Sequence, residues 1–249
     1  HLCDGIVNYL QDELPIPNSI FGRDIVIFGP TETQSAIEGN KYYSKCLMEC
    51  LGIPTSPFSF YSDIFFTDSR PPDKCVIKYP GLAKGKGVFL PKNEIDKKAI
   101  IIKLQDDYSD HWKGLIIEDR LYGTEVSVLA FCNGQKAFLM PQAQDYKNIY
   151  DNNEGPNTGG MGAVCPANIL TEKELLEVNN HMDKVVRNLN YEGVLYAGLM
   201  KTDEGVFFLE FNCRFGDPEA QVILNLLDYN FIDVLYQCME GKEVVLKWK

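Results

Sequence analysis

The chain has 249 residues, of which 45% are apolar and 24% charged, and its formal net charge is −11. This length and composition are typical of a globular chain with one large or two small domains and a sizeable core. The acidic balance argues against nucleic acid as a partner, because phosphate backbones select basic surfaces. An anionic ligand would therefore need a local basic patch.

The numbers and spacing of the cysteines and histidines indicate the redox environment of the protein and the metal sites that it can form. The eight cysteines form no Cys-x-x-Cys pair, and there are three histidines. This usage predicts buried, reduced thiols in a cytoplasmic protein rather than a disulfide framework or a zinc site. No segment has the length of a membrane span, and no signal-peptide pattern opens the chain. Because the first residue is His rather than Met, we expect an excerpt of a longer chain.

The N-terminal part of the sequence has the pattern of a β-α unit, which is typical of α/β proteins. Residues 4–14 fit a short amphipathic helix, and residues 24–30 (DIVIFGP) fit a buried strand that ends in a turn. Residues 31–52 are predicted to be helical, with an interruption near Gly39 and a stop at Gly52.

From residue 75 onward the pattern changes to short strands with flanking helices. Asn133-Gly134 is a strong hairpin signal, and a Thr171/Glu174 capping box predicts the start of a helix. The predicted strands are 75–80, 87–92, 114–121, 124–132, 135–142, 194–201 and 205–212, and the predicted helices are 171–189 and two more within 217–241. The predicted fold class is therefore α+β with antiparallel sheets.

A glycine- and lysine-rich run, GLAKGKGVFL at 81–90, suggests a loop that holds phosphate. It lacks the spacing of a Walker A loop, and Val88 stands where a Ser or Thr would bind magnesium. We interpret it as a turn between two strands whose glycine N–H groups can approach phosphate oxygens, with an ordinary hairpin tip as an equal alternative. Lys78, just before the run, fits a phosphate ligand better than a solvated surface lysine.

The stretch FLEFNCRFGDPE at 208–219 holds the densest set of polar groups. Alternation along a strand would put Glu210, Asn212 and Arg214 on one face. A carboxylate, an amide oxygen and a guanidinium in a row suit a magnesium–phosphate complex, with a polar face on an edge strand as the alternative. The apolar residues between them would share the opposite, core face: Leu209, Phe211 and Cys213.

Two further loops carry candidate ligands. The loop GPNTGGMGA at 155–163 can present consecutive N–H groups to an anion, although a plain surface loop fits the bare pattern better. Asp145 and Lys147 precede this loop at a strand end. In IIEDRLYGTE at 116–125, backbone groups at the bend suit adenine and Glu125 suits ribose hydroxyls, and the alternative is a solvated acidic turn.

The chain resembles the glycinamide ribonucleotide synthetases (phosphoribosylamine–glycine ligases) of the ATP-grasp superfamily along nearly its whole length. The motifs GPNTGGMGA and FNCRFGDPE are very specific to this family, whereas the glycine-lysine loop and the Glu-x-Asn pair are shared more widely. The segments that carry the resemblance, in the family's order, are EGNK, VIKYPGLAKGKGV, IIEDRLYGTEVS, GPNTGGMGA, LYAGLM and EFNCRFGDPEAQ.

The resemblance implies an ATP-grasp fold, in which two α+β subdomains clasp ATP between antiparallel sheets. It implies the tail of an N-terminal Rossmann-like domain at 1–30, linker helices at 31–56, a lid subdomain at 57–118 and a larger subdomain at 119–249. The family's C-terminal domain and its glycine-rich start are absent, so we expect a poorly active fragment or one module fused to other purine-pathway domains.

The resemblance also implies the ligands and the residues that bind them. Glu210 and Asn212 would hold Mg²⁺ or Mn²⁺, and Arg214 and Lys78 would be catalytic. The residues implied to bind ATP are Lys41, Lys78, Gly85, Lys86, Gly87, Glu118, Leu121 and Glu125. Those implied to bind glycine and 5-phosphoribosylamine are Asp145, Gly159, Gly160, Met161, Gly162, Arg214 and Asp217.

The implied reaction joins glycine to 5-phosphoribosylamine and splits ATP to ADP and phosphate. The glycine carboxylate would attack the γ-phosphate, and the amine would then attack the glycyl phosphate. Such chemistry needs positioning and charge neutralisation more than a protein nucleophile, and a closing lid keeps the acyl phosphate from water. The alternatives are another ATP-grasp carboxylate–amine ligase or carboxylase, and an inactive nucleotide-binding module.

Five residues depart from the family pattern. Tyr79-Pro80 stands where Ala-Asp is usual, Arg120 stands where an aromatic residue is common, and Tyr146 and Asn148 replace a His and an Arg. These departures concern the base of the glycine-lysine loop, the adenine bend and the substrate pocket. They bear on individual contacts rather than on the class of protein.

Overall fold

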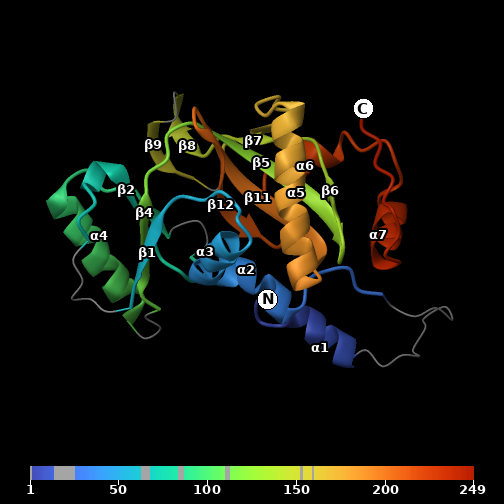
Figure 1. Ribbon diagram of the computed structural model, residues 1–249, viewed down its shortest axis with the longest axis horizontal. Coiled ribbons are helices and arrows are strands. Elements are labelled where there is room, and N and C mark those ends of the chain that lie inside the picture. Colours follow the sequence, from blue (N-terminus) through green and yellow to red (C-terminus); the bar gives the residue numbers. More distant parts are fainter. Residues whose placement is uncertain are drawn as a thin grey trace.

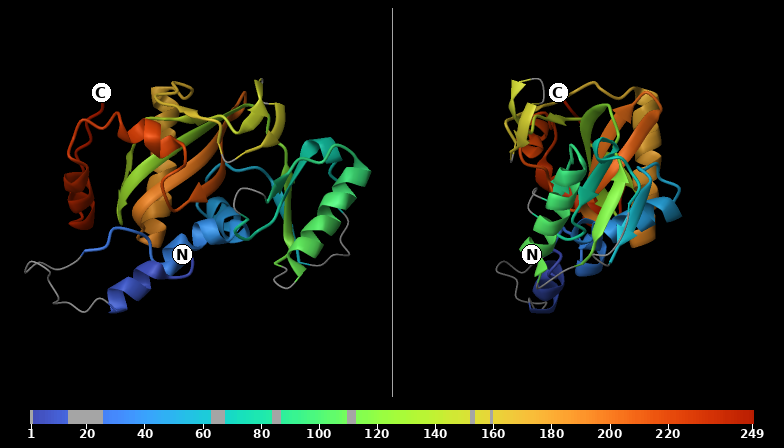
Figure 2. Two further views of the ribbon diagram at one scale, coloured as in Figure 1. Left: turned by 180° about the vertical axis from the view of Figure 1, so that it is seen from behind. Right: turned by 90° about the vertical axis from the view of Figure 1, so that its left-hand side faces the viewer.

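The computed structural model describes residues 2–13, 26–62, 68–83, 87–109, 113–151, 154–158 and 160–249. Two four-stranded antiparallel sheets organise it, and two two-stranded ribbons lie beside them (Figure 1). The views in Figure 2 place the small sheet and helix α4 at one end of the molecule and the large sheet toward the other. The predicted α+β class with antiparallel sheets is confirmed.

The large sheet buries both of its faces. Neighbouring side chains of a strand point to opposite sides of a sheet. Val126 and Val128 of β5 therefore enter one core cluster, and Leu129 and Phe131 enter the other. The strands in sheet order are β12 (Gly205–Asn212), β11 (Glu192–Thr202), β5 (Thr124–Asn133) and β6 (Ala137–Leu139).

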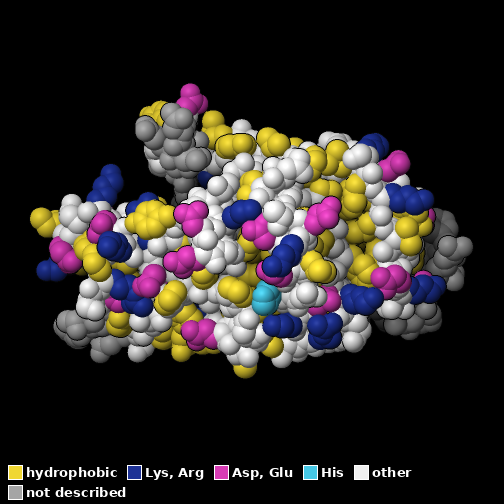
Figure 3. Space-filling model, turned by 45° about the horizontal axis from the view of Figure 1, so that its top comes forward, with side chains coloured by type: hydrophobic (Ala, Val, Ile, Leu, Met, Phe, Trp, Pro, Cys, Tyr) yellow, Lys and Arg dark blue, Asp and Glu magenta, His cyan; other side chains and the backbone are white. Residues whose placement is uncertain are grey.

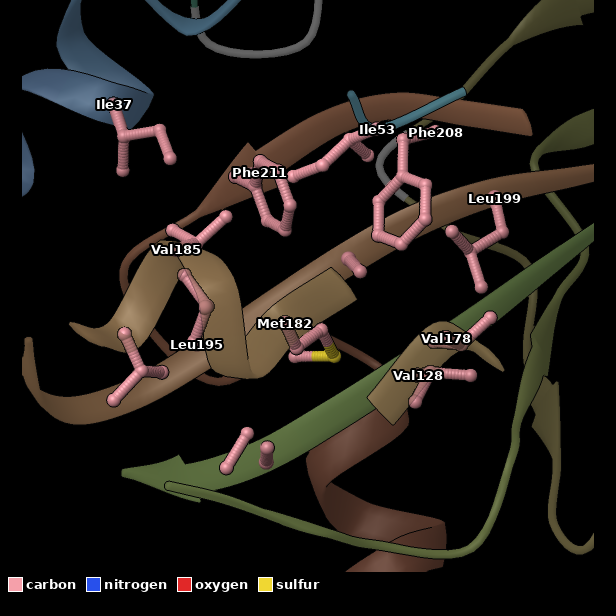
Figure 4. Close-up of a cluster of buried hydrophobic side chains, with 14 of the residues drawn as sticks. Ile37, Ile53, Val128, Val178, Met182, Val185, Leu195, Leu199, Phe208 and Phe211 are labelled. Carbon is pink, nitrogen blue, oxygen red and sulfur yellow. The ribbon is translucent and has the colours of Figure 1, made fainter. Parts of the chain in front are cut away.

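Helices cover these two faces. On one side, α5 (Glu172–Leu189) supplies Val178, Met182 and Val185 to the cluster drawn in Figure 4. Its predicted capping box is present, because Thr171 accepts from the amide of Glu174 and Glu174 caps Thr171 in return. On the other side lie α6 (Glu219–Leu224) and α7 (Phe231–Met239), so the predicted C-terminal pair of helices is confirmed.

The small sheet has one apolar face and one face that mixes buried apolar side chains, Val76 and Ile116, with charged ones. Helix α4 (Glu94–Asp107) packs Leu104 against Ile77 and Leu115 on the apolar face. The alternate residues, which include Lys78 and Glu118, face the opposite way and line the cleft described below. The strands in sheet order are β1 (Phe58–Tyr61), β4 (Leu115–Asp119), β2 (Cys75–Lys78) and β3 (Val88–Phe89).

Asn40 sets the geometry of the N-terminal helices. It ends α2 (Glu32–Gly39), and its side chain accepts from the amide of Tyr43 to begin α3 (Lys41–Cys50). The predicted interruption near Gly39 is therefore confirmed, as is the first helix, here α1 (Ile6–Glu13). Lys41 consequently stands at the first position of α3, and Lys45 follows one turn later.

The prediction of a strand at 24–30 is wrong for the residues that the structure describes there. Residues 26–30 have no strand conformation, and Val26 is 56% exposed. An apolar run forms a strand only where a sheet accepts its hydrogen bonds, and no described strand lies alongside this one. Conversely, α4 has no clear sequence pattern, because its apolar residues form the block 99–102 instead of a stripe.

The remaining elements are short and lie near the cleft. They are the 3₁₀ turn η1 (Pro72–Lys74) and the strands β7 (Gln144–Asp145), β8 (Asn148–Tyr150), β9 (Glu154–Asn157) and β10 (Ala163–Val164).

On the face shown in Figure 3, basic and acidic side chains are interspersed among apolar ones. All eight cysteines are free thiols, as predicted, but the expectation that they are buried holds only for Cys75, Cys132, Cys213 and Cys238. Among the described helices, none is long and apolar enough to cross a bilayer.

Candidate functional site

A cleft runs between the small sheet and the large sheet. It consists of two adjoining cavities of about 840 and 1110 Å³, and Lys78, Glu125 and Leu209 line both. This volume is sufficient for a nucleotide together with a small second ligand. The predicted site residues that line it are Lys41, Lys78, Gly87, Glu118, Leu121, Glu125, Asp145, Glu210, Asn212, Arg214 and Asp217.

A buried ionic group lies at the small-sheet wall of the cleft. Glu118 of β4 contacts the ammonium group of Lys78 through one carboxylate oxygen, and its other oxygen is 2.5 Å from Lys45 Nζ. All three side chains are at least 93% buried. The surface-lysine alternative for Lys78 is therefore wrong. Lys45 was not predicted, although its spacing of four residues from Lys41 places both on one side of a helix.

Burial and charge together set the protonation of this group. Burial lowers the pKa of Lys45 to about 8, against the opposing attraction of Glu118. Burial also lowers the pKa of Lys41. Burial would raise the pKa of Glu118, but attraction by Lys78 and Lys45 outweighs it and holds that pKa below its ordinary value. The carboxylate is therefore ionised at neutral pH.

Lys41 fixes the base of the glycine-lysine loop. Its amide donates to Pro80 O at 2.7 Å, and its Nζ donates to Gly81 O at 3.0 Å. Tyr79 stacks on Tyr108 with ring centroids 3.7 Å apart, and a Cβ on Gly81 would come within 2.7 Å of the Tyr79 ring. The departure at Tyr79-Pro80 is thus accommodated by packing against α4 and by glycine at position 81. Of the loop residues predicted to bind ATP, Gly85 and Lys86 lie outside the described residues, whereas Gly87 lines the cleft.

Strand β12 carries the predicted metal ligands and an irregularity. Gly198 pairs with Glu210, but the next residue of β11, Leu199, pairs with Phe208, so Leu209 forms a bulge. The bulge turns Leu209 into the cleft, where it lines both cavities. The prediction that Leu209 faces the core is therefore wrong. It is right for Phe211 and Cys213, which are both buried in the core.

Glu210 and Asn212 have the chemistry of a magnesium site. Asn212 Nδ2 lies 3.5 Å from Glu210 Oε1, so the two side chains converge on one region of the cleft. Magnesium in proteins takes one or two such ligands and completes its shell with water and substrate phosphates. Within the described ranges, no three His, Cys, Asp or Glu side chains are grouped as a metal site. Phosphate oxygens of a bound nucleotide would therefore have to complete the shell.

Arg214 takes its position from helix α2. Its Nε lies 3.0 Å from Glu38 Oε1, and the other oxygen of Glu38 accepts from the amide of Cys213 at 2.7 Å. About half of the Arg214 side chain remains exposed at the cleft. Glu38 was not predicted as a site residue, because nothing in the sequence relates it to a residue so distant in the chain.

The end of the cleft beside β7 is acidic. Glu219 is 2% exposed, and its Oε1 accepts from Tyr196 OH at 2.6 Å and from Ser127 Oγ at 2.9 Å. Asp145 and Asp217 line the same cavity. Burial raises the pKa of Asp145 to about 6, although Lys147 opposes this shift. This end suits an amine or ammonium group. Glu219, Tyr196 and Ser127 lie within the motifs that carry the resemblance, but they were not predicted as site residues.

The loop at 155–163 packs on the segment after β7. The amide of Thr158 donates to Lys147 O, that of Met161 donates to Tyr146 O, and that of Gly160 donates to Thr158 Oγ1. These three amides are therefore already used and are not free for an anion, which favours the plain-loop alternative over an anion-binding nest for this part of the loop. Gly160 packs against Pro218 beside Asp145, and Met161 and Gly162 follow it near the acidic end. Gly159 lies outside the described residues.

The bend that the resemblance assigns to adenine follows β4. Leu121 lines the larger cavity, and Glu125 lies between the two cavities with Lys147 Nζ 3.4 Å from its Oε2. Arg120 packs its guanidinium 5.1 Å from the ring centroid of Tyr122, so this departure is accommodated by its own neighbour. Tyr146 is largely exposed, and the Asn148 side chain is not described.

Solved structures define the class of fold. The D-alanyl-alanine synthetase A of Vibrio cholerae matches 86% of this chain and 68% of its own with a TM-score of 0.65 at 19% identity, which shows the fold alone. The phosphoribosylamine–glycine ligase of Thermotoga maritima matches 94% of this chain and 61% of its own with a TM-score of 0.75 at 30% identity. The chain has the ATP-grasp fold, as the resemblance implied.

Sequence comparison narrows this class to one family. Residues 39–220 match the family "Phosphoribosylglycinamide synthetase, ATP-grasp (A) domain", and the chain belongs to that family. It is 39% identical over 262 residues to a phosphoribosylamine–glycine ligase of Caldanaerobacter subterraneus, covering 98% of this chain and 62% of the relative. It is 41% identical over 239 residues to the trifunctional purine biosynthetic protein adenosine-3 of Drosophila melanogaster, covering 90% of this chain and 18% of the relative. The chain therefore spans only part of each relative.

Proposed function

We propose that this chain forms the ATP-binding and catalytic part of a ligase that joins glycine to 5-phosphoribosylamine. The observation that carries the proposal is the convergence, in one cleft, of cationic side chains with an oxygen-ligand pair. Lys41, Lys78, Glu210 and Asn212 all line the same cavity. The names of the two relatives, phosphoribosylamine–glycine ligase and trifunctional purine biosynthetic protein, support the same reaction.

In this proposal ATP lies between the two sheets. Residues 57–118 would form the lid and 119–249 the larger subdomain, with 1–30 and 31–56 as the preceding tail and linker. Backbone groups of Glu118 and Leu121 would meet adenine, and Glu125 would meet the ribose. Lys41 and Lys78 would neutralise the phosphates, and the glycine-lysine loop with Gly85, Lys86 and Gly87 would close over them.

The metal and the acceptor substrates would occupy the opposite wall. Glu210 and Asn212 would hold Mg²⁺ or Mn²⁺, which when bound neutralises phosphate charge. Arg214, oriented by Glu38, would neutralise charge on the phosphoryl group in transit. Asp145, Asp217 and the loop residues Gly159, Gly160, Met161 and Gly162 would line the region for glycine and phosphoribosylamine.

The chemistry then follows from charge and placement. The glycine carboxylate attacks the γ-phosphorus, the bond to ADP breaks, and glycyl phosphate forms. The amine of phosphoribosylamine next attacks the acyl carbon, phosphate leaves, and the amine loses a proton. Asp145, with its pKa of about 6, can accept that proton near neutral pH. Closure of the loop would keep water from the acyl phosphate.

The proposal extends to the setting of the chain. The eight free thiols support a reducing, cytoplasmic compartment. The trifunctional relative supports a longer protein in which this chain is joined to other purine-pathway domains.

A substrate-dependence assay with one metal-site variant tests the proposal. ADP release should require glycine and phosphoribosylamine together and should not respond to bicarbonate. Glu210→Ala should abolish magnesium-dependent release while thermal unfolding stays cooperative. Glu204→Ala, an exposed turn position, is the matched control and should keep full activity. Bicarbonate-dependent release would favour a carboxylase, and ATP binding without ADP release under any of these conditions would favour the inactive nucleotide-binding module.

A further inference from the structure

Lys45 is a buried cation to which the proposed function assigns no role. Its ammonium group is 2.5 Å from Glu118 Oε2 and 2.8 Å from Thr55 Oγ1, and it lies 5.7 Å from the ring centroid of Phe58. Only 3% of its side chain is exposed. Burying a lysine is costly unless the charge is paired, so a specific use of this charge is expected.

The charges of the buried group formed by Lys45, Lys78 and Glu118 indicate what the charge of Lys45 is for. Glu118 is one carboxylate between two ammonium groups, those of Lys45 and Lys78. Either lysine alone would pair it. If Lys78 engages a phosphate, it must weaken its contact with Glu118. A buried carboxylate left without any cation would strongly oppose that movement.

We propose that Lys45 is a positioning residue that keeps Glu118 neutralised and fixed, so that Lys78 is aimed into the cleft and free to turn to a phosphate of ATP. This inference rests on the proposed function, because it needs a phosphate for Lys78 to meet. Lys45 itself need not touch the ligand. It acts through Glu118.

The surroundings of Lys45 hold it in place independently of any ligand. Thr55 Oγ1, which accepts from Lys45, donates in turn to Phe208 O at 2.7 Å. The amide of Phe208 donates to Pro54 O at 2.8 Å, and Ser56 Oγ donates to Asp119 O. Residues 54–56 are therefore bonded to β12 of the large sheet and to the end of β4 of the small sheet. Lys45 sits at the junction of the two sheets.

Lys78 lacks such restraints. Among the described residues its side chain pairs only with Glu118, and it lines both cavities of the cleft. The two lysines on Glu118 differ in how they are held. Lys45, which also lines the smaller cavity, contacts Glu118, Thr55 and Ser56, whereas Lys78 lines both cavities and is held by Glu118 alone among the described residues. This asymmetry is what a release mechanism requires, because Lys78 has fewer contacts to break before it turns to a ligand.

Lys97 provides a matched comparison on the far face of the small sheet. It is also buried, with its Nζ 3.2 Å from Asp68 Oδ1 and 2.8 Å from Arg70 O. Unlike Lys45, which lines the smaller cavity, it lines neither cavity of the cleft. A purely structural role for Lys45 would make the two lysines equivalent in their effect on ligand binding.

The test is calorimetry of Mg²⁺–ATP binding to wild type and to Lys45→Met, Lys97→Met, Glu118→Gln and the double variant K45M/E118Q. We expect Lys45→Met to weaken ATP binding at least tenfold and Lys97→Met to lower the Tm without changing the Kd. In the Glu118→Gln background, Lys45→Met should weaken binding less than threefold, because no carboxylate then retains Lys78.

Each remaining outcome decides a separate point. Unchanged affinity in Lys45→Met, or an equal loss in both backgrounds, would overturn the inference. If Lys45→Met fails to fold, Lys45→Arg takes its place: it keeps the charge and should bind ATP within threefold of wild type, and a tenfold loss there would also overturn the inference. Absence of ATP binding in wild type would instead refute the proposed function, on which the inference depends.

Discussion

The two sheets bury different kinds of side chain. The large sheet is covered on both faces by apolar groups, such as Val128 on one side and Phe131 on the other. The small sheet has an apolar face beneath α4, where Ile77 and Leu115 lie, whereas its other face mixes apolar side chains such as Ile116 with charged ones. That other face buries Lys78 and Glu118, which pack with Lys45 of α3.

This difference indicates that the large sheet mainly stabilises the fold, whereas the cleft face of the small sheet mainly serves ligand binding. Burial of apolar side chains stabilises the folded state through a non-directional effect, and it requires no partner of opposite charge. Buried charge is stable only with a partner, and replacing such a group by apolar residues is often neutral or stabilising. Ionic burial at the cleft face of the small sheet is therefore better explained by ligand binding than by folding. Substitutions in the two sheets should separate these roles.

The largest effect is expected for Glu118→Gln, because it removes the single carboxylate between two buried lysines. Breaking a buried ion pair in this way costs about 3–5 kcal/mol, so the free energy of unfolding should fall by that amount. Chemical denaturation monitored by circular dichroism measures it. The control is Glu204→Gln at an exposed turn. A loss below about 1 kcal/mol would mean that the buried charges are not mutually dependent.

Met182→Ala should also lower the free energy of unfolding, but it should leave ATP binding unchanged. Met182 is fully buried between α5 and the large sheet, and its truncation should cost about 2–4 kcal/mol through lost contacts and a cavity. ATP affinity of the folded variant should equal that of wild type, because the residue lines neither cavity. Leu176→Ala, on the exposed side of the same helix, is the control and should change stability by less than about 0.5 kcal/mol. A larger Kd for ATP in Met182→Ala would show that packing in the large sheet also affects ligand binding.

The sequence predicted most of the large sheet because its signals are local. The apolar stripe and capping box of α5, and the turn at Asn133-Gly134, each depend on residues within a few positions of one another. The 24–30 strand failed for the converse reason. An apolar run forms a strand only if the edge of another strand is available to pair with it. Whether such an edge is available depends on the tertiary structure and not on the local sequence.

The site was predicted less completely, because its geometry depends on contacts between distant segments. The bulge at Leu209 arises from the pairing of two strands, and neither strand sequence reveals it. The pairing of Arg214 with Glu38 joins residues 176 positions apart. Lys45 and Glu118 likewise come from different elements. Motifs located the polar residues of the cleft, but not the partners that orient them.

A smaller effect is expected from pH. The pKa of Lys45 is lowered to about 8 by burial, with Glu118 opposing and Lys78 and Glu49 also facing it. Lys45 therefore loses its proton as the pH rises through 8, and Glu118 should then retain Lys78. ATP affinity should fall up to tenfold, about 1.4 kcal/mol, between pH 7 and pH 9. Calorimetry at several pH values measures this.

Lys45→Arg is the matched variant for this experiment, because a guanidinium stays charged throughout the range. Its affinity profile should be flatter than that of wild type. The pKa of Lys41 is also lowered by burial, so any slope left in Lys45→Arg would belong to Lys41. Equal slopes in both proteins would show that the charge of Lys45 does not control binding.

The smallest effect is expected at the acidic end of the cleft and has the opposite sign. Burial raises the pKa of Asp145 from 3.8 to about 6, and its Oδ1 is buried without a hydrogen-bond partner. The folded state therefore binds more protons than the unfolded state between these two values, and stability falls as the pH rises from 3.8 to 6. Above pH 6 the full cost of the ionised carboxylate is present.

Asp145→Asn removes that cost and should stabilise the protein at pH 7.5 by about 1 kcal/mol after allowance for partial exposure. The gain should vanish at pH 4, where the wild-type carboxyl is protonated in the folded state. Asp203→Asn, the same change at an exposed turn, should have no such pH-dependent gain. Thermal unfolding at both pH values measures the difference. A stabilised but inactive Asp145→Asn would show that the β7–β10 ribbon beside the large sheet also carries a functional cost, which the apolar faces of that sheet do not.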